Sequence, residues 1–231
     1  MAARDIKRTV TRPARSVGSR IGTSNKQTDS GTTELSRGQS AIIDAAMHLF
    51  GEMGYTGTTM RDIAKAVGVL PGSLYAHIQS KETLLVEIVD AGIRSFLSAV
   101  EPHASSNRPA RERMRSAIKA HIAVVADNPQ RSLVVFHQWR FLSEPNLAAA
   151  IEKRRRYERA FTRIAQDGVK SGEFSLDLDT RITVFSILGA LNWTPEWYSP
   201  EGSATPAELG DLMADTLLNG LLKAPRMASR T

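Results

Sequence analysis

Residues 60–79 read MRDIAKAVGVLPGSLYAHIQ, and this stretch decides the fold. Ala64 is small where two helices would cross at close range, and Gly68, four residues later, permits the positive φ of a tight turn. The apolar residues that the two helices would bury in a shared core are Ile63, Val67, Val69, Leu74 and Ile78. The polar residues that lie off this apolar stripe, free to face a groove, are Arg61, Lys65, Ser73, Tyr75 and His77. The pattern predicts a helix-turn-helix.

The sequence before the turn keeps the period of an α-helix. Apolar residues recur at intervals of three and four over 36–53, and this stripe stops before Gly54. A short second helix is expected from about Thr59 to Val67, with Thr58 or Thr59 as its N-cap. The helix over 36–53 would pack against the helix-turn-helix, and the helix from about Thr59 to Val67 would be the first helix of that motif.

The rest of the chain is also helical in pattern. Pro71 has a fixed φ that suits the first turn of a third helix, and Ser80 is expected to cap a fourth one that runs through Leu97. Beyond Pro102 the pattern predicts five more helices, over 108–126, 130–142, 146–171, 179–193 and 206–222. No convincing strand pattern interrupts them. The predicted fold class is all-α, with about nine helices and an N-terminal three-helix helix-turn-helix domain.

The positive charge of the chain is concentrated at its N-terminus. The formal net charge is +6, and residues 1–26 carry this excess, because the remainder holds 23 basic and 23 acidic residues. Residues 1–34 are poor in aromatics, so disorder is expected there, and again at 225–231. We expect the basic tail to follow the DNA phosphates or to enter the adjacent minor groove. A solubilising extension and an organelle transit peptide are the alternatives. Between these ends, the expected domains are 35–82 and 83–224.

Composition and motifs exclude several functional classes. The chain has no cysteine, which excludes disulfides, thiolate nucleophiles and thiolate metal sites. Its five histidines include no pair at i,i+4, and the sequence has no HExxH, no G-x-S-x-G and no phosphate-binding glycine loop. The longest nearly uncharged apolar stretch, 182–193, is shorter than the roughly 20 residues of a membrane-spanning helix. We therefore expect a soluble, cytoplasmic, non-enzymatic protein without a cofactor or metal.

A stretch around the helix-turn-helix resembles the DNA-binding domain of TetR-family transcriptional regulators. It runs from Ile42 to Leu85 and contains LFGEMGYTGTTMRDIAKAVGVLPGSLYAHIQSKETLL. Marks of the family are Phe50, the Gly54-Tyr55 pair and the Gly-Ser-Leu-Tyr block that is followed by Ser-Lys-Glu. One position departs, because the family usually has an aromatic residue where Ile78 stands, which changes the packing volume of the core. The resemblance implies a regulator that binds double-stranded DNA.

The resemblance also implies which residues contact DNA. The third helix is then the recognition helix in the major groove, and the second helix crosses the backbone. Matches to the family's phosphate contacts are Thr59, Tyr75 and His77, with Lys81 adding charge beside the first amides of the fourth helix. The residues best placed to reach base edges are Arg61, Leu70, Gly72 and Ser73.

The family's C-terminal domain binds an effector and forms a homodimer. Over the last two helices the apolar faces are broader than one core needs, and Gly189 and Ala190 would allow close approach across an interface or would pack internally. The candidate ligand-binding residues are His121, Phe136, His137, Arg140, Tyr157 and Trp193, with Val125, Trp139, Phe141 and Phe161 as further lining residues. For any single aromatic residue at helical spacing, a place in the packed core is the commoner role. A polar residue such as Arg140 needs a partner if it is buried, and an anionic ligand is one such partner.

The stretch from Leu178 to Pro200 looks like one branch of the family, whose better-known members respond to acyl-CoA thioesters. The basic run of residues 153–156, Lys-Arg-Arg-Arg, would receive a CoA phosphate or is a solvated helix face, and lipophilic or aromatic effectors stay open. We expect a repressor that a small-molecule effector releases from a palindromic operator, with the fourth helix as lever. A ligand-dependent activator and a non-catalytic helical interaction module without sequence-specific DNA binding are the alternatives.

Overall fold

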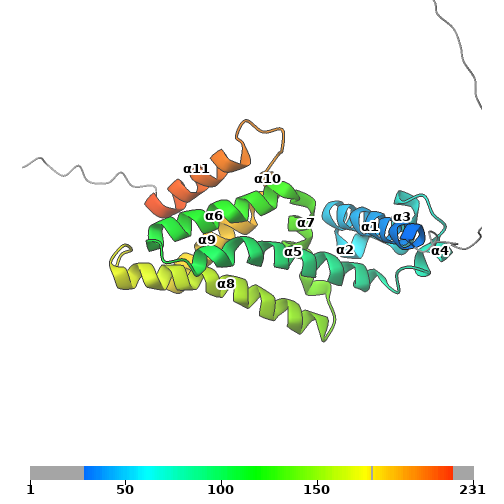
Figure 1. The fold of residues 1–231 in the computed structure, drawn as a ribbon, viewed down its shortest axis with the longest axis horizontal. Helices are drawn as coiled ribbons and strands as arrows, with labels where there is room; N and C mark the ends of the chain where they lie inside the picture. The colour runs from blue at the N-terminus through cyan, green and yellow to red at the C-terminus, as the bar shows by residue number, and fades with distance from the viewer. Residues whose placement is uncertain (1–28, 178, 221–231) are drawn as a thin grey trace, which may run out of the picture. The chain divides into compact units, whose positions relative to one another are not determined.

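The structure is a computed structural model, and it describes residues 29–177 and 179–220. Every regular element within these ranges is a helix, which confirms the predicted all-α class (Figure 1). Most of the expected basic tail and the expected disordered end at 225–231 lie outside the described residues. No helix in the described part of the chain is both long and apolar enough to cross a membrane.

Five helices precede the connection at Ser105. They are α1 (Asp29–Glu52), α2 (Gly54–Gly57), α3 (Met60–Ala66), α4 (Pro71–Tyr75) and α5 (Lys81–Ala104). The side chain of Thr59 accepts a hydrogen bond from the Asp62 amide and forms a capping box with Asp62, and Ser80 caps α5. Gly68 has a φ of +72° between α3 and α4. Local side-chain chemistry therefore sets the helix starts and the turn as the pattern predicts.

The core of the helix-turn-helix differs from the prediction at one position. Ile63, Leu74 and Ile78 are buried as expected, and Ala64 is fully buried where a small residue was required. Val69, expected to share this core, is instead 39% exposed. It follows Gly68, whose left-handed backbone turns the chain away from α3, so its side chain lies outside the helix crossing.

The bounds of the early helices differ from the expected ones in three places. α1 begins at Asp29, inside the segment for which the sequence predicts disorder. α2 is a single helical turn that the pattern does not predict. α5 continues through Pro102 to Ala104, because Val100 and Ala104 are buried and their packing outweighs the cost of a proline inside a helix.

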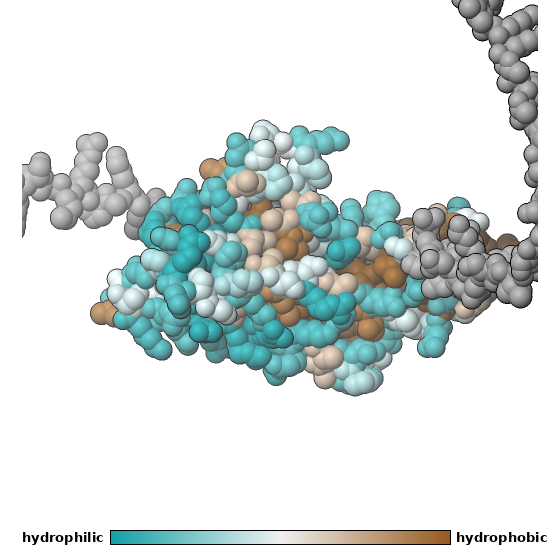
Figure 2. Space-filling view, in the orientation of Figure 1, coloured by the Kyte–Doolittle hydropathy of each residue, from teal (hydrophilic) through white to brown (hydrophobic). Residues whose placement is uncertain are grey.

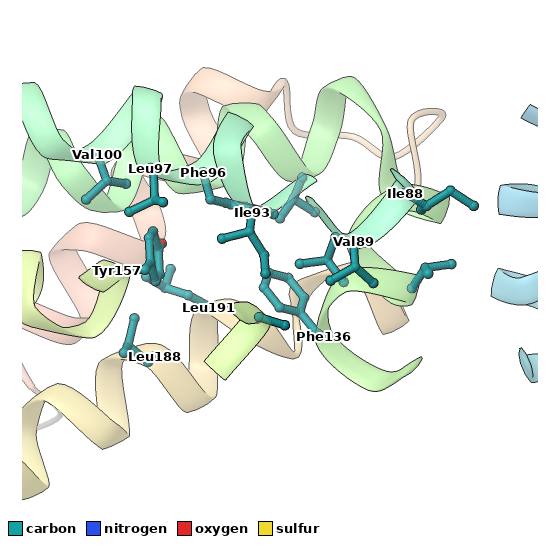
Figure 3. Close-up of a cluster of buried hydrophobic side chains, with 14 of the residues drawn as sticks. Ile88, Val89, Ile93, Phe96, Leu97, Val100, Phe136, Tyr157, Leu188 and Leu191 are labelled. Carbon is teal, nitrogen blue, oxygen red and sulfur yellow. The ribbon is translucent and has the colours of Figure 1, made fainter. Parts of the chain in front are cut away.

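The second part of the chain contains the larger core. Its elements are α6 (Ala110–Asp127), α7 (Pro129–Leu133), η1 (Val134–Gln138), η2 (Trp139–Phe141), α8 (Asn146–Ser171), α9 (Thr180–Asn192), α10 (Thr194–Trp197) and α11 (Pro206–Asn219). Side chains from α5, η1, α8 and α9 meet in a buried cluster, in which Figure 3 labels Ile88, Val89, Ile93, Phe96, Leu97, Val100, Phe136, Tyr157, Leu188 and Leu191. The face seen in Figure 2 is mostly hydrophilic, with hydrophobic side chains gathered toward its middle.

The segment expected as one helix over 130–142 is broken into three pieces. α7 is followed by η1, a π-helical turn, and then by η2, a 3₁₀ turn. Two long-range hydrogen bonds hold this irregular backbone: Arg154 Nη1 donates to the Val135 carbonyl at 3.2 Å, and Gln138 Oε1 accepts from the Tyr55 amide at 3.0 Å. Such partners lie far away in the sequence, so a local helical period does not reveal the break.

Candidate functional site

Most of the predicted DNA contacts lie on or next to α3 and α4 and are accessible. The exposed residues among them are Thr59, Arg61, Leu70, Gly72, Ser73, Tyr75 and His77. Leu70 is 79% exposed and Tyr75 is 55% exposed. Hydroxyl, imidazole and guanidinium groups on one surface are the groups that bond to phosphates and base edges. The structure thus leaves all seven residues accessible, and their contact with DNA stays a prediction.

Lys81 is placed differently from the other predicted contacts. It is half-buried at the first position of α5, and its Nζ donates to the carbonyls of Tyr55 at 2.7 Å and Thr58 at 2.8 Å. The same ammonium lies 4.2 Å from the centre of the Tyr55 ring. Because an ammonium has three donors, two are used inside the protein. Lys81 therefore ties α5 to the end of α2, and its phosphate contact stays a prediction.

A cavity of about 160 Å³ lies among α5, η1, η2, α8 and α9. Its lining residues are Ile93, Phe96, Val135, Phe136, Trp139, Ile151, Arg154, Arg155, Tyr157, Glu158, Leu188 and Asn192. Of the predicted ligand-binding residues, Phe136 and Tyr157 line it, and so does the further candidate Trp139. The sequence did not predict the aliphatic lining residues, because a buried aliphatic residue has the same helical spacing whether it faces a cavity or a packed core.

His121 lies in the packed core beside this cavity. Its Nδ1 is 2.6 Å from the Tyr157 hydroxyl and its Nε2 is 3.1 Å from the Leu191 carbonyl. Burial lowers the pKa of His121 to about 3 and raises the pKa of Tyr157 above its usual value. The imidazole is therefore neutral, with Nε2–H donating to the carbonyl and the tyrosine hydroxyl donating to Nδ1. Phe96 and Phe136 stack against this pair, with ring centroids 4.8 and 5.7 Å from the imidazole.

Four of the six predicted ligand-binding residues do not line the cavity: His121, His137, Arg140 and Trp193. His137 Nε2 lies 3.0 Å from Glu196 Oε1, and the His137 ring packs edge-on against Trp193 at 6.3 Å. Arg140 is exposed, and its guanidinium carbon lies 4.9 Å from the centre of the Trp139 ring. Among the described residues, no three His, Asp or Glu side chains gather as metal ligands would.

The basic run on α8 has divided roles. Lys153 pairs with Asp90 on α5, and Arg156 pairs with Glu101 on the same helix. Arg154 and Arg155 instead line the cavity. Lys153 and Arg156 therefore join α8 to α5, and only Arg154 and Arg155 are available to a ligand in the cavity.

The segment that walls the cavity also contacts the helix-turn-helix half. Phe141 stacks on Tyr55 with ring centroids 5.6 Å apart, next to the hydrogen bond between the Tyr55 amide and Gln138. Just beyond η2, the amide and hydroxyl of Ser143 donate to Glu82 Oε1 at 2.8 and 2.6 Å. These hydrogen bonds hold the pKa of the Glu82 carboxyl below its usual value. Residues 134–143 thus line the cavity and also contact Tyr55 and Glu82, which flank the helix-turn-helix, and we call them the linking segment.

Two family models match this chain. Residues 42–88 match the model described as bacterial regulatory proteins of the tetR family, and residues 107–221 match the tetracyclin repressor-like C-terminal domain. Among relatives, the HTH-type transcriptional repressor KstR2 of Rhodococcus jostii is 28% identical over 200 residues, which are 82% of this chain and 94% of the relative.

Solved structures agree with these matches. The TetR-family regulator PfmR from Thermus thermophilus has a TM-score of 0.71 at 29% identity and covers 79% of this chain and 99% of its own. AibR, solved with isovaleryl coenzyme A and operator DNA, has a TM-score of 0.70 at 26% identity and covers 78% of this chain and 98% of its own. The chain therefore belongs to the TetR family, which confirms the predicted class of DNA-binding transcriptional regulator rather than enzyme.

Proposed function

We propose that this chain acts in the cytoplasm as a repressor that binds a palindromic operator as a homodimer. A small-molecule effector in the cavity releases it. The observation that supports this proposal is the position of the linking segment: Val135, Phe136 and Trp139 line the cavity, while Gln138 and Phe141 contact Tyr55. A ligand that moves this wall also acts on the part of the chain that carries α3 and α4.

An acyl-CoA thioester is the effector class that we favour. The apolar part of the lining, which includes Ile93, Phe96 and Leu188, suits an acyl chain. Arg155 is exposed beside the cavity and offers a cation to the charged part of such a ligand. The likeness to AibR, whose structure holds isovaleryl coenzyme A and operator DNA, adds support. Other lipophilic compounds fit the same lining and are outcomes of the test.

The release mechanism is an equilibrium between two arrangements of the helices. A ligand shifts such an equilibrium only by its difference in affinity for the two states. α5 is one lever, because Lys81 at its start holds the carbonyls of Tyr55 and Thr58 while Ile93 and Phe96 line the cavity. The linking segment is a second lever that reaches the same tyrosine through Gln138. We expect both to move when the effector binds.

The homodimer is supported by apolar surface on the last helices. Ile182 and Phe185 on α9 are 59% and 44% exposed, and Leu212 on α11 is 60% exposed. A Cβ at Gly189 on α9 would meet no atom within 4 Å. A second copy that packs on these residues would bury them, and a two-fold axis would place two recognition helices roughly 34–36 Å apart on DNA.

Operator recognition is tested by capture of genomic fragments. The purified full chain is mixed with fragments of the source genome at near-physiological salt, and the bound fragments are sequenced. We expect a short palindrome to recur, and the His77→Ala variant to lose it. Arg159→Ala is the matched control, because Arg159 is exposed on α8 and pairs with Glu152. Diffuse, salt-sensitive binding alone would contradict specific recognition by α4.

The effector role is tested by titration of isovaleryl-CoA and hexanoyl-CoA with and without the recovered operator. We expect at least a fivefold weaker affinity for the effector when operator is bound, because linkage makes the two ligands oppose each other. Equal affinities for both compounds would mean that neither is coupled to DNA. Transcription from the operator is then measured in vitro with the ligand-free protein. Lower transcription is expected of a repressor, and higher transcription would make the chain an activator.

A further inference from the structure

Trp139 in the wall of the cavity stands beside two cations. The guanidinium carbon of Arg154 lies 4.7 Å from the centre of the indole, and that of Arg140 lies 4.9 Å from it. An aromatic face attracts a guanidinium, so one such contact is ordinary. Two like charges beside a single ring repel each other, and a bound anion would offset that repulsion.

Among the described residues, neither guanidinium lies within ion-pair distance of a carboxylate, although Glu158 also lines the cavity. Within this part of the chain, neither Arg140 nor Arg154 takes part in an ion pair, whereas their neighbours Lys153 and Arg156 both do. The one hydrogen bond of the Arg154 guanidinium goes to the neutral carbonyl of Val135. Burial, helped by the charge of Arg140, lowers the pKa of Arg154 to about 10, so the group is still charged at neutral pH. A half-buried cation without an anion is costly, and a bound anion lowers that cost.

Two further polar atoms at the cavity lack partners. Trp139 Nε1 and Asn192 Oδ1 are buried, and neither has a hydrogen-bond partner among the described residues. Most buried polar atoms in proteins are bonded, so such orphans indicate a missing group. The indole N–H can only donate, as can a guanidinium. The Trp139 N–H and the Arg154 guanidinium can therefore both be satisfied by an acceptor in the ligand, and the strongest acceptor is an anionic oxygen.

We propose that Arg154 and the Trp139 N–H form a binding site for an anionic group of the effector, a carboxylate or a phosphate, and that the exposed guanidinium of Arg140 adds positive charge beside it. Asn192 Oδ1, as an acceptor, then takes a hydroxyl or amide N–H of the same ligand. This inference rests on the proposed function of the cavity as the effector site. It adds that an uncharged lipophilic compound is a poor ligand, whatever its fit to the apolar lining.

The test is isothermal titration calorimetry on the full chain with three probes. Isovalerate carries a carboxylate, coenzyme A carries phosphates, and isovaleramide is the uncharged match of isovalerate. We expect at least one anion to bind at least tenfold more tightly than the amide. Arg154→Gln should weaken binding of that anion at least tenfold, and Arg154→Lys should weaken it less. Trp139→Phe should weaken it about threefold to tenfold, because the substitution removes one donor and keeps an aromatic ring. Tighter binding of isovalerate would identify the anion as a carboxylate, and tighter binding of coenzyme A would identify it as a phosphate.

Arg159→Gln is the control, because Arg159 is exposed on the same helix and pairs with Glu152 rather than facing the cavity. Circular dichroism and urea unfolding establish that each variant is folded. The proposal is wrong if neither anion binds more tightly than isovaleramide, or if Arg154→Gln binds the anion as well as the unsubstituted chain does. Operator binding of the unsubstituted chain without any probe is measured separately, so a failure of the repressor proposal is distinguishable from a failure of this site.

Discussion

His121 links the stability of this protein to pH. Its folded pKa of about 3 lies below the roughly 6.5 of an unfolded histidine. Below pH 6.5 the unfolded chain binds a proton that the folded chain excludes, so stability falls as the pH falls toward 3. Between pH 6 and 5 we expect the unfolding free energy to drop by about 1 kcal/mol more in the unsubstituted chain than in His121→Gln. Urea unfolding at the two pH values measures this difference, and equal drops would contradict a buried neutral imidazole.

Single residues also show what sequence reasoning can reach. The caps at Thr59 and Ser80 and the positive φ of Gly68 were predictable, because each depends on chemistry within a few residues. His137 was predicted to face a ligand, but it lies against Glu196 and Trp193, which come from other parts of the chain. A helical period shows that a residue is on one face, but not which element covers that face.

At the scale of elements, the crossing of α5 and the linking segment depends on a glycine. A Cβ added at Gly92 would overlap the side chain of Val135 and press on Arg131. We expect Gly92→Ala to lower the unfolding free energy by about 1–3 kcal/mol, the usual cost of overpacking. Gly38→Ala is the control, since a Cβ there meets no atom within 4 Å and the helix should gain about 0.5–1 kcal/mol. Urea unfolding compares the two, and a stabilised Gly92→Ala would contradict the tight crossing.

Elements differ in how far the sequence predicts them. α8 has the predicted bounds, because its pattern ends at Gly172, whose φ of +75° closes the helix. The break of 130–142 was not predictable, since Arg154 and Tyr55 hold the irregular backbone from distant positions. The candidate DNA surface was therefore foreseen from a local motif. The cavity was foreseen only in part, because tertiary contacts decide which aromatic residues line it.

At the scale of the whole molecule, the apolar face of α9 predicts the assembly state. Phe185 is 44% exposed with the Arg181 guanidinium over its ring. We expect Phe185→Glu to weaken the homodimer at least tenfold, because a charge would be buried at the interface, and to weaken operator binding with it. Sedimentation velocity measures the assembly. Asn107→Glu, at an exposed loop position, is the control, and an unchanged dimer in Phe185→Glu would place the interface elsewhere.

The π-helical turn in the linking segment also sets the phase of the residues that follow it. One extra residue in a turn rotates each later side chain by about 100° relative to an uninterrupted α-helix. In the present phase Gln138 and Phe141 meet Tyr55. A return to α-helical phase would turn both side chains away from Tyr55 in one step. We therefore expect the Gln138 and Phe141 contacts with Tyr55 to form or break together. The linking segment would then have two discrete conformations rather than a continuous range.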